Sequence, residues 1–308
     1  MISRRNIRIK VMQLSYALET INDQSDKKDP IKSLKNLLDN SRELCTFMLY
    51  YITEVARYAE KDASHRASKN LTSAHDLNVN IKIAGNEVMW KIIENKSFIS
   101  AIEQYKPNLL EEGQNMIKKT YQALIQMEEY RTYIAENGRT KKGESGILEF
   151  IMNDLLLTDE KVILFFEENF PTFDDDVEML QKIVKGIFQK PNGFDLQGFL
   201  PEETWQYAKS IFRTIRDKKE YLLDLIKPKL RNWDSERIAH IDMILLEMGV
   251  AELLYFETIP PKVTINEYID IAKEYSTDQS GQFINGILDG LKKDFEAEGR
   301  LNKIDFRK

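Results

Sequence analysis

Apolar residues recur every three or four positions along most of the chain, which is the spacing of one face of an α-helix. Near the N-terminus this spacing is followed by Ile7, Val11, Leu14, Leu18 and Ile21. After a polar turn, a longer stripe from Leu34 to Val55 predicts one helix over about residues 31–61. Cys45 lies in this stripe, so we expect it to be a core residue and not a reactive thiol.

The rest of the chain repeats the helical pattern. We predict helices over about residues 81–104, 109–134, 147–156, 159–168, 174–189, 201–226, 238–254, 261–275 and 276–297. Residues 137–146 and 190–193 are rich in turn formers and predict loops. Asp234 or Ser235 is expected to cap the helix after it, and Ser276 with Gln279 fits a capping box. Since no segment shows a convincing strand pattern, the sequence predicts an all-α fold.

Length and composition narrow the class of protein. The 308 residues allow one large domain or two ordinary ones, at roughly 150 residues per domain. The single cysteine excludes an internal disulfide and fits a reducing compartment. Apolar runs stay shorter than the roughly 18 residues of a membrane span. Gln13, Ser15 and Glu19 interrupt the apolar core that a signal peptide would need, so we expect a cytoplasmic protein that does not act in the membrane.

Motifs for catalysis or metal binding are weak. The sequence has no phosphate-binding P-loop, dinucleotide-binding glycine pattern or zinc-binding H-E-x-x-H motif. The aspartates at 174–176 point in different directions on a helix, so we interpret them as stabilising its first turn. The histidines His65, His75 and His240 lie at no metal-ligand spacing. We therefore expect no enzyme, no metal site and no cofactor.

One local basic patch stands out against an acidic total charge. The 44 lysines and arginines against 50 acidic residues give a net charge of −6, so general binding to nucleic acid is not expected. Residues 3–10 nevertheless carry four positive charges. On a helical wheel Arg5, Arg8 and Tyr16 fall within about 80° of one another. Arginines can bind phosphates and tyrosine can stack a base. The alternative is a basic helix whose long side chains lie along the core.

Four segments of the sequence resemble the bacterial transcription antitermination factor family NusB. Residues Arg4–Tyr16 are similar to the arginine-rich first helix of that family. The other three follow in the family's order and spacing: Trp233–Asp242 with the apolar helix after it, Ile259–Glu267, and Phe283–Asp289. The resemblance covers about residues 1–22 and 195–308. Met243 and Glu247 stand where the family often has arginines.

The resemblance implies a helical bundle of two packed subdomains, with a helical insertion or an elaborated N-terminal half. We accordingly expect a basic N-terminal helix at 1–22 that belongs to the NusB-like core. An extra helical region of unknown role would follow at 23–175, and a NusB-like C-terminal domain at 176–308.

The same resemblance implies a function. The protein would bind boxA RNA of ribosomal RNA transcripts together with NusE, a small-subunit ribosomal protein, and act indirectly on elongating RNA polymerase. Lys229 and Asp242 would lie at the NusE interface. Phe283 could stack a base or be plain core, and both interpretations stay open. The expected RNA-binding residues are Arg4, Arg5, Arg8, Gln13, Tyr16, Lys262, Gln279, Gln282 and Phe283.

A second class of function remains open. The fold could serve as a helical protein–protein scaffold, or as a homodimer, with RNA binding lost or masked. The acidic total charge and the two missing arginines favour this alternative, whereas the basic N-terminal helix favours RNA binding. Charge reversal at Arg5 and Arg8 would separate the two. An RNA-modifying enzyme is a weaker third option, because no glycine-rich cofactor loop is present.

Overall fold

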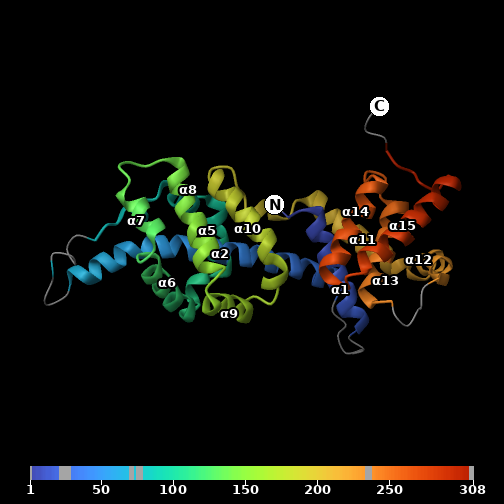
Figure 1. Cartoon of the computed structure of the whole chain (residues 1–308), viewed down its shortest axis with the longest axis horizontal. Coiled ribbons are helices and arrows are strands. Elements are labelled where there is room, and N and C mark those ends of the chain that lie inside the picture. The colour runs from blue at the N-terminus through green and yellow to red at the C-terminus, as the bar shows by residue number, and fades with distance from the viewer. Residues whose placement is uncertain (1, 21–28, 69–72, 74–78, 233–237, 305–308) are drawn as a thin grey trace. The chain divides into compact units, whose positions relative to one another are not determined.

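The predicted all-α fold is confirmed in a computed structural model that describes residues 2–20, 29–68, 73, 79–232 and 238–304 (Figure 1). These residues form fourteen α-helices and several short helical turns, with no strand among them. Within the same residues, none of the helices has the length and apolar character that crossing a bilayer requires. The expected helix cap at Asp234 or Ser235 lies outside the described residues.

The chain folds into two compact units. Unit 1 comprises residues 37–199, and unit 2 comprises residues 2–36 and 200–308. The sequence-based boundaries at residues 22/23 and 175/176 stay predictions.

Unit 2 is built around α13 (His240–Tyr255). Every residue of α13 from Ile244 to Leu253 is buried, which is the pattern of a helix covered on all sides. At Gly249 an added Cβ would lie 2.8 Å from a methyl group of Leu288, so glycine permits the close approach of α15. The helices packed on α13 are α1 (Arg4–Thr20), α11 (Glu202–Asp217), α12 (Lys219–Ile226), α14 (Pro261–Tyr275) and α15 (Ser280–Ala297).

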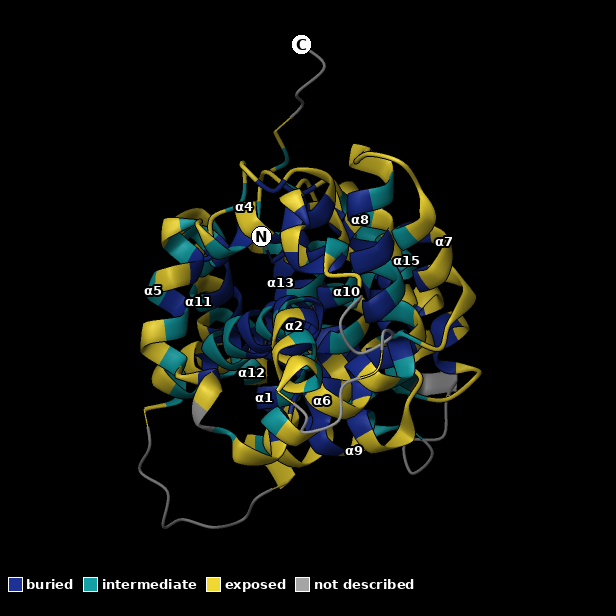
Figure 2. Cartoon of the chain, turned by 90° about the vertical axis from the view of Figure 1, so that its left-hand side faces the viewer, coloured by how far each residue is buried: buried dark blue, intermediate teal, exposed yellow. Residues whose placement is uncertain are grey.

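Unit 1 is organised around residues 37–67 of the long helix α2 (Pro30–Ala67), whose buried residues appear dark blue in Figure 2. The ring of Phe47 packs against those of Phe165, Phe166 and Phe170 at centroid distances of 5.7, 5.3 and 5.0 Å. Cys45 is fully buried, as predicted. The other helices are α4 (Glu87–Ile93), α5 (Lys96–Tyr105), α6 (Glu111–Leu124), α7 (Glu128–Ala135), α8 (Lys141–Phe150), α9 (Glu160–Asn169) and α10 (Phe173–Gln189).

Three predicted long helices are interrupted in the structure. The predicted helix at 81–104 is a short turn, Lys82–Gly85, followed by α4 and α5, because Asn86 and Asn95 cap new helices with their side chains. The predicted helix at 109–134 divides into α6 and α7, and the one at 201–226 divides at Lys218. Apolar periodicity continues across each break, so it does not reveal where the backbone changes direction.

Two local predictions are wrong. The predicted loop at 137–146 is helical from Lys141 onward, because Thr140 accepts a hydrogen bond from the Gly143 amide and caps α8. The predicted capping box at Ser276 and Gln279 does not form, since α15 begins at Ser280. Its hydroxyl accepts a hydrogen bond from the Thr277 amide instead. The turn at 190–193 and the acidic first turn of α10 are as predicted.

Candidate nucleic-acid interface

The basic helix α1 presents two arginines at the surface of unit 2. Arg4 and Arg5 are partly exposed, with 42% and 34% of their side-chain surface accessible. Each forms one ion pair at 2.8 Å, Arg4 with Glu203 on α11 and Arg5 with Glu274 on α14. Exposed ion pairs of this kind contribute about 0–1 kcal/mol to the free energy of unfolding. A phosphate can therefore replace the carboxylate at small cost in stability.

Arg8 has a different environment. Only 3% of its side chain is exposed, and its guanidinium donates two hydrogen bonds to Glu252 on α13, at 2.8 and 2.9 Å. A third contact, at 3.2 Å, joins it to Glu267 on α14. The guanidinium also lies 5.7 Å from the ring centres of Tyr207 and Tyr268. Arg8 thus connects α1 to three other helices of unit 2, and its predicted contact with RNA phosphate stays a prediction.

The carboxylate of Glu252 is the centre of this network. Besides Arg8, it accepts hydrogen bonds from the hydroxyls of Tyr207, Thr264 and Tyr268, at 2.6, 2.8 and 3.2 Å. Burial disfavours the charged forms of Arg8 and Glu252, but the hydrogen bonds between these two side chains outweigh the effect of burial. They raise the pKa of Arg8 and lower the pKa of the Glu252 carboxyl. Both groups are therefore charged across the physiological pH range.

The second half of α1 carries Gln13 and Tyr16. Gln13 is partly buried, whereas Tyr16 is 40% exposed. The Tyr16 ring meets the His240 ring edge to face at 5.4 Å, and His240 in turn contacts Glu19 at 2.8 Å. The Tyr16 ring therefore makes one contact inside unit 2, while a substantial part of the side chain stays accessible.

The predicted RNA-binding residues of the last third are spread along α14 and α15. Lys262, Gln279 and Gln282 are exposed. Lys262 stands in the first turn of α14, about 18 Å along the helix from Glu274, the partner of Arg5. Gln279 and Gln282 follow the opposite end of α14, so they lie nearer to the end that Arg5 contacts. The structure thus separates Lys262 from the other exposed candidates.

Phe283 is 4% exposed and lies in the apolar face of α15. This burial matches the core interpretation of the residue. Stacking of an RNA base on Phe283 would require the side chain to become accessible.

The two residues assigned to the NusE interface are already engaged within unit 2. Asp242 is 4% exposed and accepts a hydrogen bond from the Ser280 hydroxyl at 2.7 Å. Lys229 is partly buried and lies 2.5 Å from the carboxylate of Asp294. Their role at a protein interface stays a prediction.

Sequence reasoning gave Glu252 no role and noted Glu247 only as a position where the family often has an arginine. Both are acidic residues within a helix that is otherwise apolar on every side, which is the signal that could have identified them. Glu252 is paired, as described above. Glu247 is 4% exposed, and no described residue forms a hydrogen bond or ion pair with it. Burial is the main reason why its pKa rises to about 7.

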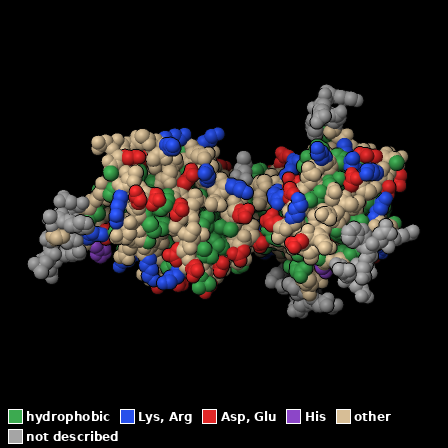
Figure 3. All heavy atoms as spheres, viewed as in Figure 1, with side chains coloured by type: hydrophobic (Ala, Val, Ile, Leu, Met, Phe, Trp, Pro, Cys, Tyr) green, Lys and Arg blue, Asp and Glu red, His purple; other side chains and the backbone are tan. Residues whose placement is uncertain are grey.

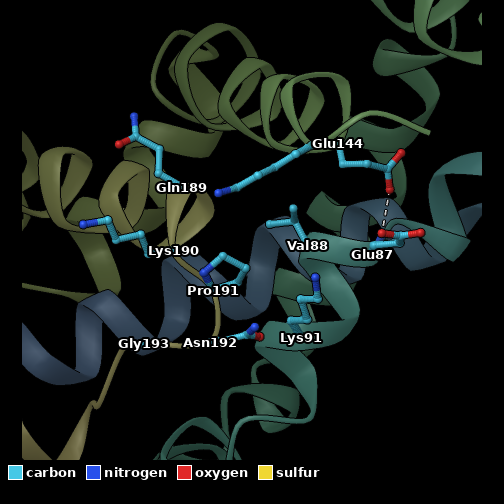
Figure 4. Close-up of a pocket in the computed structure, with 10 residues that line it drawn as sticks. Glu87, Val88, Lys91, Glu144, Gln189, Lys190, Pro191, Asn192 and Gly193 are labelled. Carbon is cyan, nitrogen blue, oxygen red and sulfur yellow. Dashed lines mark hydrogen bonds between the residues drawn. The ribbon is translucent and has the colours of Figure 1, made fainter.

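Unit 1 contains a separate hollow, which Figure 4 shows. Its buried carboxylate, Glu144, points toward the backbone of Glu87 and accepts a hydrogen bond from that amide at 2.7 Å. Tyr133 and Arg139 donate to the same carboxylate at 2.8 and 2.9 Å. Glu144 is therefore fully paired and joins α8 to α4 and α7.

Charges of both signs alternate on the face that Figure 3 shows, in agreement with the small net charge. In the part of the chain that the structure describes, acidic, histidine and cysteine side chains form no group that could hold a metal ion.

Comparison with known proteins gives a family match in the C-terminal part. Residues 173–293 match the model of the NusB family. The transcription antitermination protein NusB of Salinibacter ruber is 45% identical over 100 residues, which are 32% of this chain and 62% of that protein. NusB of Chloroherpeton thalassium is 36% identical over 126 residues, which are 41% of this chain and 57% of that protein.

The chain thus spans about three fifths of the length of these curated relatives. A solved structure of T. maritima NusB is 36% identical and covers 32% of this chain and 72% of its own, with a TM-score of 0.30. An extra helical region on the N-terminal side of residue 173 lies outside the family match.

Proposed function

Because residues 173–293 form a NusB-family domain, we propose that this protein is an RNA-binding transcription antitermination factor. It binds boxA-type RNA of ribosomal RNA operons together with NusE and suppresses termination by RNA polymerase in the cytoplasm. It performs no catalysis and needs no cofactor. The supporting observation is that Arg8 fixes the basic helix α1 onto α13 and α14, which lie in the family domain.

In this proposal the residues of α1 have different tasks. Arg4 and Arg5 exchange their surface carboxylates for phosphates of the RNA. A single RNA strand carries one phosphate per nucleotide, so several lie within reach of the two arginines. Arg8 is a positioning residue that holds α1 through Glu252. Tyr16, Gln279 and Gln282 supply stacking and hydrogen bonds to unpaired bases. Lys229 and Asp242 are kept as candidates for contact with NusE.

One observation favours the alternative of a protein scaffold or dimer. All three arginines at the start of α1 contact carboxylates within unit 2, so their positive charge is neutralised there. The exposure of Arg4 and Arg5 argues that this neutralisation is reversible. Binding to RNA is therefore the function that we propose.

Transcription by purified RNA polymerase through a boxA-containing leader and a terminator tests the function. We expect the protein with NusE to increase read-through several-fold, and a template with a scrambled boxA to show no increase. Equal read-through on both templates would contradict the proposal.

A further inference from the structure

A pocket of about 290 Å³ lies in unit 2 between the second half of α1, α11 and α13. Its inner lining is buried and mostly apolar, with Phe212, Ile215 and Ile244 each at most 4% exposed. Leu18, which is 44% exposed, and the exposed Arg216 lie at its outer edge. An apolar cavity of ~150 Å³ already accommodates benzene. The pocket therefore has room for a short aliphatic chain.

Glu247 is the acidic side chain among these buried residues. Its residue surface is 4% exposed, and within the described residues no side chain forms a hydrogen bond or ion pair with its carboxylate. The buried glutamates Glu144 and Glu252 each have three or more donors. The buried aspartates Asp176 and Asp242 each accept a hydrogen bond from a serine hydroxyl. The Glu247 oxygens are not closed off from solvent, so the carboxylate meets water in the pocket. An ammonium group that replaced this water would form a charge-assisted hydrogen bond with it.

The neighbouring charges do not supply that donor. Lys219 lies 2.5 Å from Glu19, which also contacts His240 at 2.8 Å. Arg216 stacks over the Phe212 ring at 5.5 Å. Glu19 and its two partners thus form a nearly neutral group at the rim. The charges of Lys219 and Glu19 act on Glu247 in opposite directions without a hydrogen bond to it, so its carboxylate has room for an incoming cation.

We propose that this pocket binds an aliphatic chain that ends in a primary ammonium group, with the methylenes against Phe212, Ile215 and Ile244 and the ammonium on Glu247. Two sources present this chemistry: a lysine side chain of a partner polypeptide and a free alkylamine. The inference does not depend on RNA binding by α1.

Titration with n-butylammonium chloride at pH 8 tests the proposal, with the δ1 methyl groups of isoleucine labelled for NMR. Burial raises the pKa of Glu247 to about 7, so its carboxylate is mostly ionised at pH 8. We expect saturable shifts of the Ile215 and Ile244 methyl signals, while that of Ile187 in unit 1 stays unchanged. Glu247→Gln should weaken binding at least tenfold, and the same change at the exposed Glu220 of α12 should not.

A short peptide with one lysine, Ala-Ala-Lys-Ala-Ala, distinguishes the two sources. Tighter binding of the peptide than of the amine would assign the pocket to a lysine side chain of a protein partner, and the reverse would assign it to a free amine. Unchanged Ile215 and Ile244 signals with both ligands, or equal affinity of the wild type and Glu247→Gln, would overturn the proposal. The methyl signal of buried Ile287 reports whether each variant is folded.

Discussion

Glu252→Gln is expected to destabilise unit 2 by about 3–5 kcal/mol at pH 7, because it leaves the buried guanidinium of Arg8 without its counter-charge. The side chain keeps its size, so the loss reports the ion pair and not a cavity. Hydrogen exchange of amides in α1 and α13 measures the effect locally. Each 1.4 kcal/mol should lower their protection about tenfold, and the largest loss is expected in α1.

Glu274→Gln is the matched control for this variant. It removes the partner of Arg5, which is an exposed residue, so a loss below about 1 kcal/mol is expected. If both variants lost the same stability, the Arg8–Glu252 pair would not be what holds α1 in place.

The same pair predicts a pH dependence. The folded pKa of Glu252 is below its ordinary value, so the folded protein binds fewer protons there than the unfolded chain. The stabilisation is therefore present above the ordinary glutamate pKa and is lost as pH falls through the folded value. The difference between the wild type and Glu252→Gln should shrink on acidification. A constant difference down to the lowest pH at which the protein folds would contradict this origin.

The second large effect concerns RNA affinity. Replacing Arg4 and Arg5 together by glutamate should weaken boxA RNA binding by about 10- to 100-fold near 0.1 M salt, because two phosphate contacts become repulsive. The slope of log affinity against log salt should fall by about 1.4 units, at roughly 0.7 per phosphate of a single strand. A fluorescence titration across a salt series gives both quantities.

A charge-matched variant controls for the change in net charge. Lys227 and Arg213 are exposed positions of unit 2 away from the start of α1, and their joint replacement by glutamate should leave RNA affinity within about twofold. An equal loss in both double variants would mean that only total charge matters. Arg8 is unsuitable for this test, because its replacement disturbs the fold itself.

The sequence predicts the helical class and most helix positions because burial follows apolar periodicity, as the stripes of α1, α2 and α13 show. It does not reveal the breaks at Asn86 and Asn95, since an asparagine caps a helix only when the backbone before it is extended. Where a helix ends and the next begins depends on packing contacts that apolar periodicity does not reveal.

The candidate site was predictable only in part. The cluster of arginines on α1 is evident from the sequence, but the role of Arg8 depends on a partner 244 residues away. Helical wheels place Arg5 and Arg8 near each other and cannot tell that one faces solvent and the other a buried glutamate. Phe283 raised the same difficulty, because an aromatic residue near a helix start suits both the core and a base.

Binding of a labelled boxA RNA to the full chain, with and without NusE, is the most direct measurement of the central claim. We expect tighter binding to boxA than to a scrambled RNA, a further gain when NusE is added, and a steep loss of affinity with salt. If the chain bound both RNAs equally weakly and NusE changed nothing, the antitermination role would be wrong, and the family domain would serve a different function in this protein.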